Sequence, residues 1–329
     1  MRKILSLNPH LDGLPVWKDA AVPVTSLDPG FHLRSRAGQL FFLLRNARRF
    51  ELILIPNDLW LAAMFRLLAP AGPGCARVAL LGFYYDANPC RQGLRAQLRH
   101  AKYKFLARAV DRIIVHTSTE IALCSESLGL DASRFEFIPY YAYDDAIGTL
   151  PGQDSIPGKP LVLAPGRHRD FACFCKAVTG LNGRAAIVCG TSDLSEVQHA
   201  AFGSQIEIHS EVPLARYREL MGAADIVVIP LFAVRWQRSL GQIAWFDAAL
   251  MNKPVVIART FHLADYVSEN EALFYEPGDA ADLRRQLERL LGSPQLRASL
   301  AANAFRRVRS EFTEERFAAA LAAACQRWL

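Results

Sequence analysis

The sequence lacks any apolar run close to the ~18 residues that suggest a membrane-spanning helix. It also lacks the long apolar segment of a secretory signal, because Pro9 and Asp12 interrupt its beginning. We therefore expect residues 3–7 to form a first β-strand in a cytoplasmic protein. Of the 329 residues 51% are hydrophobic, which is enough for two domains with substantial cores.

The sequence also lacks a cysteine pattern typical of disulfides or zinc. The seven cysteines are odd in number and scattered along the chain. Cys173 and Cys175 are spaced like a pair of metal ligands, but no second Cys/His pair accompanies them. We expect buried thiols in a reducing compartment.

Excess charge is nearly absent from the second half of the chain. Residues 151–329 hold 20 Lys/Arg and 19 Asp/Glu, whereas residues 1–150 hold 18 and 13. The basic first half favours an anionic partner, such as a phosphate-bearing acceptor, an anionic lipid surface or nucleic acid. No nucleic-acid-binding motif accompanies the basic residues, so we expect no nucleic acid partner.

Short apolar strands alternate with helical patterns in both halves, which predicts an α/β fold with mainly parallel sheets. Residues 144–160 interrupt this alternation with three Pro and three Gly and predict an inter-domain linker. The expected strands are 3–7, 21–24, 51–55, 78–81, 112–116, 135–138, 161–164, 185–188, 206–208, 226–229, 255–258 and 273–274. The expected helices are 33–48, 59–68, 91–109, 119–128, 171–178, 214–221, 242–250, 281–291, 295–308 and 313–326.

Two strand-to-helix turns in the second half are typical of anion binding. The first holds Gly166, Arg167 and Arg169, and backbone amides, two cations and a helix start together suit a diphosphate. The second, residues 239–242, precedes a helix that carries Asp247, whose carboxylate could accept hydrogen bonds from ribose hydroxyls. The alternatives are two solvated surface arginines and an interior carboxylate paired with a nearby Arg.

These turns, together with Lys253-Pro-Val-Val256 and the Glu276-Pro-Gly-Asp279 turn, resemble the donor half of GT-B glycosyltransferases of family 4. The resemblance covers residues 110–329 well and residues 1–109 poorly. It implies two Rossmann-like doubly wound domains facing across a cleft. Residues 1–150 would form the acceptor-side domain, 151–311 the nucleotide-sugar-binding domain, and 312–329 a helix returning to the first domain.

The resemblance implies a retaining transferase that moves a sugar from a nucleotide-diphosphate sugar to an acceptor hydroxyl, in cell-surface glycan or glycolipid assembly. Arg167 and Arg169 would be the catalytic cations that stabilise the leaving diphosphate. Asp247 matches the family's ribose-binding Glu, but Ser239 stands where the family has a sugar-contacting Glu. This departure keeps open a non-catalytic nucleotide-sugar-binding or interaction subunit. The expected donor-binding residues are Gly166, Arg167, Arg169, Ser239, Leu240, Gly241, Gln242 and Asp247.

The acceptor side is less well marked, because the His that family members carry after the fourth strand is missing. We expect Tyr84, Asp86 or His116 to serve the acceptor, with a buried core histidine as the alternative for His116. Glu120 stands at a helix start, where capping alone would account for it.

Asp-x-Asp is absent, so a metal-dependent sugar-nucleotide site is unsupported, and we expect neither a metal nor a cofactor. In the basic run 91–112, Leu94, Leu98 and Phe105 recur at helical spacing, with Arg95 and Arg99 on the other side. This predicts either an anionic membrane surface as partner, on the inner face of the membrane, or a core-packed helix with a solvated basic face. The other expected partners are a nucleotide sugar and a glycan or lipid-linked acceptor.

Overall fold

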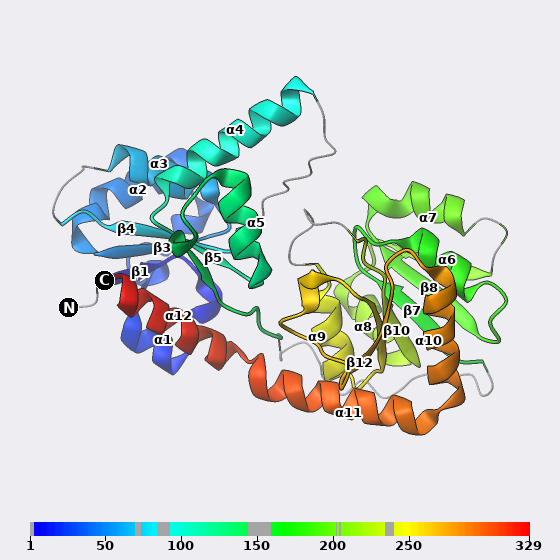
Figure 1. Cartoon of the computed structure of the whole chain (residues 1–329). Helices are drawn as coiled ribbons and strands as arrows, with labels where there is room; N and C mark the ends of the chain where they lie inside the picture. Colours follow the sequence, from blue (N-terminus) through cyan, green and yellow to red (C-terminus); the bar gives the residue numbers. More distant parts are fainter. Residues whose placement is uncertain are drawn as a thin grey trace. The chain divides into compact units, whose positions relative to one another are not determined.

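The computed structural model describes residues 3–69, 74–83, 93–143, 159–201, 203, 205–233 and 240–329. The chain forms two compact units (Figure 1). Unit 1 holds the chain up to Tyr141 together with Glu314–Leu329, and unit 2 holds most of the chain between them. No helix within the described ranges is both long and apolar enough to cross a lipid bilayer.

Unit 1 is built on a six-stranded sheet in the order β2-β1-β3-β4-β5-β6, and every pair of neighbours is parallel. The sequence runs outward from β1 in both directions, which places a topological switch point between β1 and β3. The strands are β1 (Ile4–Ser6), β2 (Val22–Pro23), β3 (Leu52–Pro56), β4 (Arg77–Leu81), β5 (Arg112–Val115) and β6 (Phe135–Phe137).

Alternate residues of these strands enter two separate cores, because successive side chains of a strand point to opposite faces. Ile53 and Ile55 pack in the core that lies beneath α2 (Arg36–Asn46), α3 (Leu59–Leu68), α4 (Leu94–Ala109) and α5 (Thr119–Leu128). Leu52 and Leu54 pack in the other core, with α1 (Pro15–Ala20) and α12 (Glu314–Trp328). The last helix of the chain therefore completes one face of the first unit.

Unit 2 repeats the architecture with the order β12-β11-β10-β7-β8-β9, again parallel throughout. Here the switch point lies between β7 and β10. Its strands are β7 (Leu161–Pro165), β8 (Arg184–Cys189), β9 (Ile206–Ser210), β10 (Ile226–Ile229), β11 (Val255–Ala258) and β12 (Ala272–Tyr275). All twelve strands expected from the sequence are present, which confirms the α/β prediction.

Three helices of unit 2, α6, α10 and α11, begin at residues whose side chains cap them. Asp170 caps α6 by accepting from the Cys173 amide at 2.9 Å, and Asp279 caps α10 by accepting from two amides. α6 packs against α7 and α10, and α9 packs against α11. The helices are α6 (Phe171–Val178), α7 (Leu194–Ala200), α8 (Leu214–Ala223), α9 (Gln242–Leu250), α10 (Ala280–Gly292) and α11 (Pro294–Glu311).

All six cysteines in the described ranges are free thiols, and five of them are buried. Burial raises the pKa of the Cys173 thiol to about 11. The Cys173–Cys175 pair lies on α6 within the packed core of unit 2. The thiols therefore act as small apolar side chains, as the sequence predicts.

Candidate functional site

The candidate site lies at the carboxyl edge of the unit 2 sheet, at the switch point between β7 and β10. In open α/β sheets, ligands bind in the crevice outside the strand ends at such a point. The amide of Asp170, after β7, donates to the Pro230 carbonyl, after β10, at 2.9 Å and ties the two loops together. α6 and α9 both begin at this edge, so the positive ends of two helix dipoles meet there.

Gly166 makes the first turn possible. Its φ is +128°, and a Cβ placed on it would lie 2.7 Å from Arg169 Nε. Its amide donates to the Val188 carbonyl at 2.9 Å and continues the β7–β8 pairing past the strand. The close approach that the sequence predicts at this glycine is therefore made by the guanidinium of Arg169.

Arg167 points outward, toward the ends of β8 and β9. Its Nη2 pairs with Glu211 Oε2 at 2.8 Å, and its side chain is largely exposed. Its Cγ, Cδ and Nε lie 3.1 Å from where a Cβ of Gly190 would stand. Glu211 also accepts from the Thr191 amide at 2.9 Å, so it holds Arg167 over the β8 loop.

Arg169 points inward and is only 6% exposed. Among the described residues, neither its Nε nor its Nη1 has a hydrogen-bond partner. Burial lowers its pKa to about 10, partly offset by Tyr217 and by the Asp193 carboxylate. A buried cation without hydrogen-bond partners is costly, so this position is suited to an anion that would complete its bonding.

His262, on the short helical turn after β11, lies near Arg169 and is 1% exposed. Its ring stacks on Phe261 with centroids 4.0 Å apart, and neither ring nitrogen has a partner within the described ranges. Burial, with the Arg169 charge second, lowers the pKa of the imidazole to about 4. His262 is therefore neutral at physiological pH.

The second turn predicted from the sequence supports this histidine. Gly241 caps α9 with φ of +100°, and Leu240 precedes it in the intermediate range of burial. Gln242 is buried at the helix start, and its Nε2 donates to the His262 carbonyl at 3.0 Å. The side chain of Gln242 thus positions the turn that carries His262. Ser239 lies outside the described residues.

Asp247, one and a half turns into α9, accepts a hydrogen bond from the Tyr217 hydroxyl of α8 at 2.8 Å. Burial raises the pKa of the carboxyl, against the lowering effects of that bond and of Arg218. The pKa of Tyr217 is also raised, chiefly by burial. Tyr217 also lies close to Arg169, so it neighbours both the predicted ribose ligand and the predicted phosphate ligand.

On the acceptor side, His116 lies in the packed interior of unit 1, 5% exposed. Its Nδ1 is 3.0 Å from the Ile138 carbonyl, and its ring contacts Tyr140 and Phe317. Its Nε2 faces Gly82, at the end of β4, where a Cβ would lie 3.4 Å away. Tyr84 and Asp86 lie outside the described residues.

Glu120 has the capping role that the sequence allows. Its Oε2 accepts from the amides of His116 and Thr117, both at 3.0 Å. Glu120 therefore fixes the turn between β5 and α5, and its carboxylate is already bonded to backbone amides.

The structure thus brings Gly166, Arg169, Gly241 and Gln242 together at the carboxyl edge of the unit 2 sheet. Asp247 lies further along α9. Of the two arginines, Arg167 is exposed at the surface and Arg169 is buried. Sequence reasoning missed the participants Tyr217, His262, Glu211 and Asp193. Only Glu211 carried a local signal, because it lies three residues after the expected strand 206–208 and strand ends gather at this edge.

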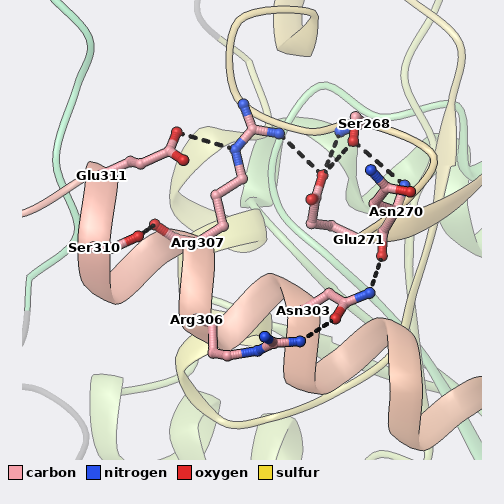
Figure 2. Close-up of a pocket in the computed structure, with 8 residues that line it drawn as sticks. All are labelled: Ser268, Asn270, Glu271, Asn303, Arg306, Arg307, Ser310 and Glu311. Carbon is pink, nitrogen blue, oxygen red and sulfur yellow. Dashed lines mark hydrogen bonds and ion pairs between the residues drawn. The ribbon is translucent and has the colours of Figure 1, made fainter.

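A separate hollow of about 450 Å³ lies between the loop before β12 and α11 (Figure 2). Its charges pair with one another: Arg307 lies 3.0 Å from Glu271 and 3.3 Å from Glu311. Ser268 donates its hydroxyl to Glu271 at 2.7 Å. Most of the charge in the hollow is therefore paired, and its other cation, Arg306, donates a hydrogen bond to Asn303 Oδ1 at 2.5 Å. Among the described residues, no three His, Cys, Asp or Glu side chains are placed to hold a metal ion.

Solved structures define the class of fold. The chain has the GT-B glycosyltransferase fold, with two parallel six-stranded sheets covered by helices. Anabaena HepE in complex with UDP-glucose superposes with a TM-score of 0.70 at 16% identity, over 100% of both chains. Sucrose-phosphate synthase from Thermosynechococcus elongatus gives 0.66 at 18% identity, over 96% of this chain and 82% of that one. A glycosyltransferase from Rickettsia africae gives 0.67 at 13% identity, over 99% and 98%.

The family comparison is more local. A family model described as glycosyl transferase-like matches residues 167–323, from the first predicted arginine into α12. No curated protein sequence matches the chain. The predicted GT-B fold is therefore confirmed, the glycosyl transferase-like match extends over residues 167–323, and the assignment to family 4 stays a prediction.

Proposed function

We propose that the chain is a glycosyltransferase that takes a sugar from a nucleotide-diphosphate sugar held at the β7–β10 switch point. The observation that carries the proposal is Arg169, a buried guanidinium whose Nε and Nη1 lack partners among the described residues. A diphosphate supplies the negative charge and the acceptor oxygens that this group lacks. Anabaena HepE has been crystallised with UDP and with UDP-glucose, which supports a ligand of this class.

Transfer builds negative charge on the diphosphate as the bond to the sugar breaks. Arg169 and the amino-terminal ends of α6 and α9 are fixed in place before that charge develops, so they stabilise it without reorganising. Arg167 would add a second cation after exchanging Glu211 for the distal phosphate. A bound metal ion is not needed for this role.

The finer features rest on the resemblance to family 4. The transfer would proceed with retention of configuration, and the departing phosphate would take the proton of the acceptor hydroxyl. Asp247 would hold the ribose, and Ser239 would stand in the place of the family's sugar-contacting Glu. The acceptor would be a glycan or a lipid-linked molecule of cell-surface assembly, and Tyr84, Asp86 or His116 would serve it.

A thermal-shift screen of the full chain against UDP, GDP and ADP tests the donor site. A ligand at ~100 times its Kd adds about 2.7 kcal/mol of stability, which raises Tm by several degrees. Release of nucleoside diphosphate from the corresponding sugar nucleotides then tests transfer or hydrolysis. Nucleotide binding without release of nucleoside diphosphate would favour the alternative that Ser239 leaves open, a non-catalytic nucleotide-sugar-binding subunit. No shift with any nucleotide contradicts the proposed site.

A further inference from the structure

α4 has an apolar stripe that faces solvent. Leu94, Leu98 and Phe105 are 71%, 61% and 59% exposed, and they stand at intervals of four and seven residues along one side of the helix. Leu106 and Ala107 are buried and attach the helix to the core of unit 1. Of the two alternatives for this run, the core-packed stripe is therefore contradicted, because the buried side of α4 carries Leu106 and Ala107 instead.

The rest of the exposed surface of α4 is cationic. The helix has 16 residues and contains five Lys/Arg and no Asp or Glu. On a helical projection, Arg95, Arg99 and Lys102 flank one side of the stripe and Arg108 the other. No acidic side chain in the described ranges forms an ion pair with these four cations. The cations are therefore available to an external anion.

Further apolar side chains are exposed on α3, which packs against α4. Leu67 and Leu68, at the end of α3, are 48% and 60% exposed. An exposed apolar stripe with a polar rim marks an interaction surface. The described part of unit 2 offers fewer exposed large apolar residues, namely Tyr143, Leu214, Ile243 and Phe305.

We propose that α4 lies flat on an anionic lipid surface, with Leu94, Leu98 and Phe105 in the boundary between headgroups and acyl chains and the flanking cations on lipid phosphates. The pattern favours lipid over a protein partner because cations border the stripe on both sides without one acid among them. Their long aliphatic stems let the charges reach headgroups while Leu and Phe enter the apolar layer. This inference does not depend on the proposed transferase activity.

Co-sedimentation of the full chain with vesicles tests the proposal directly. We expect binding to vesicles of equal phosphatidylglycerol and phosphatidylcholine and little binding to phosphatidylcholine alone. Raising the salt from about 0.05 M to about 0.5 M should weaken the binding, because screening shortens the reach of the basic residues.

Matched variants separate the stripe from general surface effects. Leu98→Ser should weaken binding about tenfold through lost apolar burial. Leu214→Ser, at 59% exposure on α8, changes an equally exposed leucine in unit 2 and should leave binding unchanged. The double change Arg95→Glu/Lys102→Glu should weaken binding at least about 25-fold, at roughly fivefold per charge. Lys176→Glu/Arg289→Glu makes the same charge change in unit 2 and should have little effect.

Three outcomes overturn the proposal. One is equal binding to neutral vesicles, and another is a Leu98→Ser variant that binds as the parent does. The third is a self-associated parent in sedimentation velocity that becomes monomeric on Leu98→Ser, which would assign the stripe to a second copy of the chain. Because the altered side chains are exposed, Tm should not change, and a Tm measurement checks that each variant is folded.

Discussion

The Tyr217 hydroxyl donates a hydrogen bond to Asp247 Oδ2 at 2.8 Å and joins α8 to α9 next to the buried Arg169. The residue predicted to bind ribose is thus already held in one orientation by a neighbour from another helix. A carboxylate held in this way loses less freedom when a ligand hydroxyl arrives.

Tyr217→Phe tests this link. Removing the hydroxyl leaves a partly buried carboxylate short of a donor, so unfolding free energy should fall by about 1–3 kcal/mol in chemical denaturation. UDP affinity, measured by calorimetry, should fall as well if the carboxylate holds ribose. An unchanged unfolding free energy would mean that the bond contributes nothing.

The raised pKa of Asp247 makes a second variant informative. A carboxyl whose folded pKa lies above its unfolded pKa costs stability once pH exceeds the unfolded value, and costs nothing below it. Asp247→Asn should therefore be more stable than the parent at neutral pH. This advantage should vanish in acid, below the ordinary pKa of Asp. Equal stability at every pH would contradict the shift.

Arg169→Met should separate folding from binding. Met has a similar length and no charge, so the variant should be at least as stable as the parent in denaturant titration. UDP affinity should fall roughly tenfold to a hundredfold, the value of hydrogen bonds to a charged group. Arg167→Met is the matched control at an exposed site, and it should lower ground-state UDP affinity less than Arg169→Met does. Full UDP affinity in Arg169→Met would remove the basis of the proposed donor site.

His262 should respond to pH and to ligand. Its folded pKa of about 4 lies below the ordinary value near 6.5, so the unfolded chain takes up the proton first as pH falls. The parent should lose stability from pH 6.5 downward, by at most roughly 3 kcal/mol near pH 4, and His262→Gln should lack that part of the loss. No difference between the two pH profiles would contradict a buried neutral imidazole.

A bound diphosphate should also offset the Arg169 charge beside His262 and raise the pKa of the imidazole. Calorimetry in buffers of different ionisation enthalpy measures the resulting proton uptake on UDP binding near pH 5. We expect uptake by the parent and none by His262→Gln. Equal uptake by both would place the titrating group elsewhere.

Gly241→Ala tests the turn that begins α9. At φ of +100° a Cβ is strained, and it would lie 3.0 Å from Leu263 Cδ1, so we expect a loss of about 1–3 kcal/mol in unfolding free energy. Gly222→Ala is the control, because it lies in α8 with nothing within 4 Å of the added carbon. That change should stabilise the chain by about 0.5–1 kcal/mol.

The strands and the long helices were predictable because their apolar periods are local. α1 was missed since its six residues begin at a proline and show less than two turns of pattern. Tyr217 could not be found, because its partner lies 30 residues away and α8 has the composition of a surface helix. Tertiary packing also decided two features that local sequence could not show. It buries Arg169, and it leaves the apolar stripe of α4 exposed.

The two sheet cores of unit 1 have a practical consequence for dividing the chain. α12 contributes Phe317, Leu321 and Cys325 to the core that Leu52 and Leu54 share with α1. A fragment truncated after Tyr141 would expose the apolar side chains of that sheet face to solvent and would be prone to aggregation. An autonomous first half would need the final sixteen residues, Glu314–Leu329, grafted back through an engineered connection.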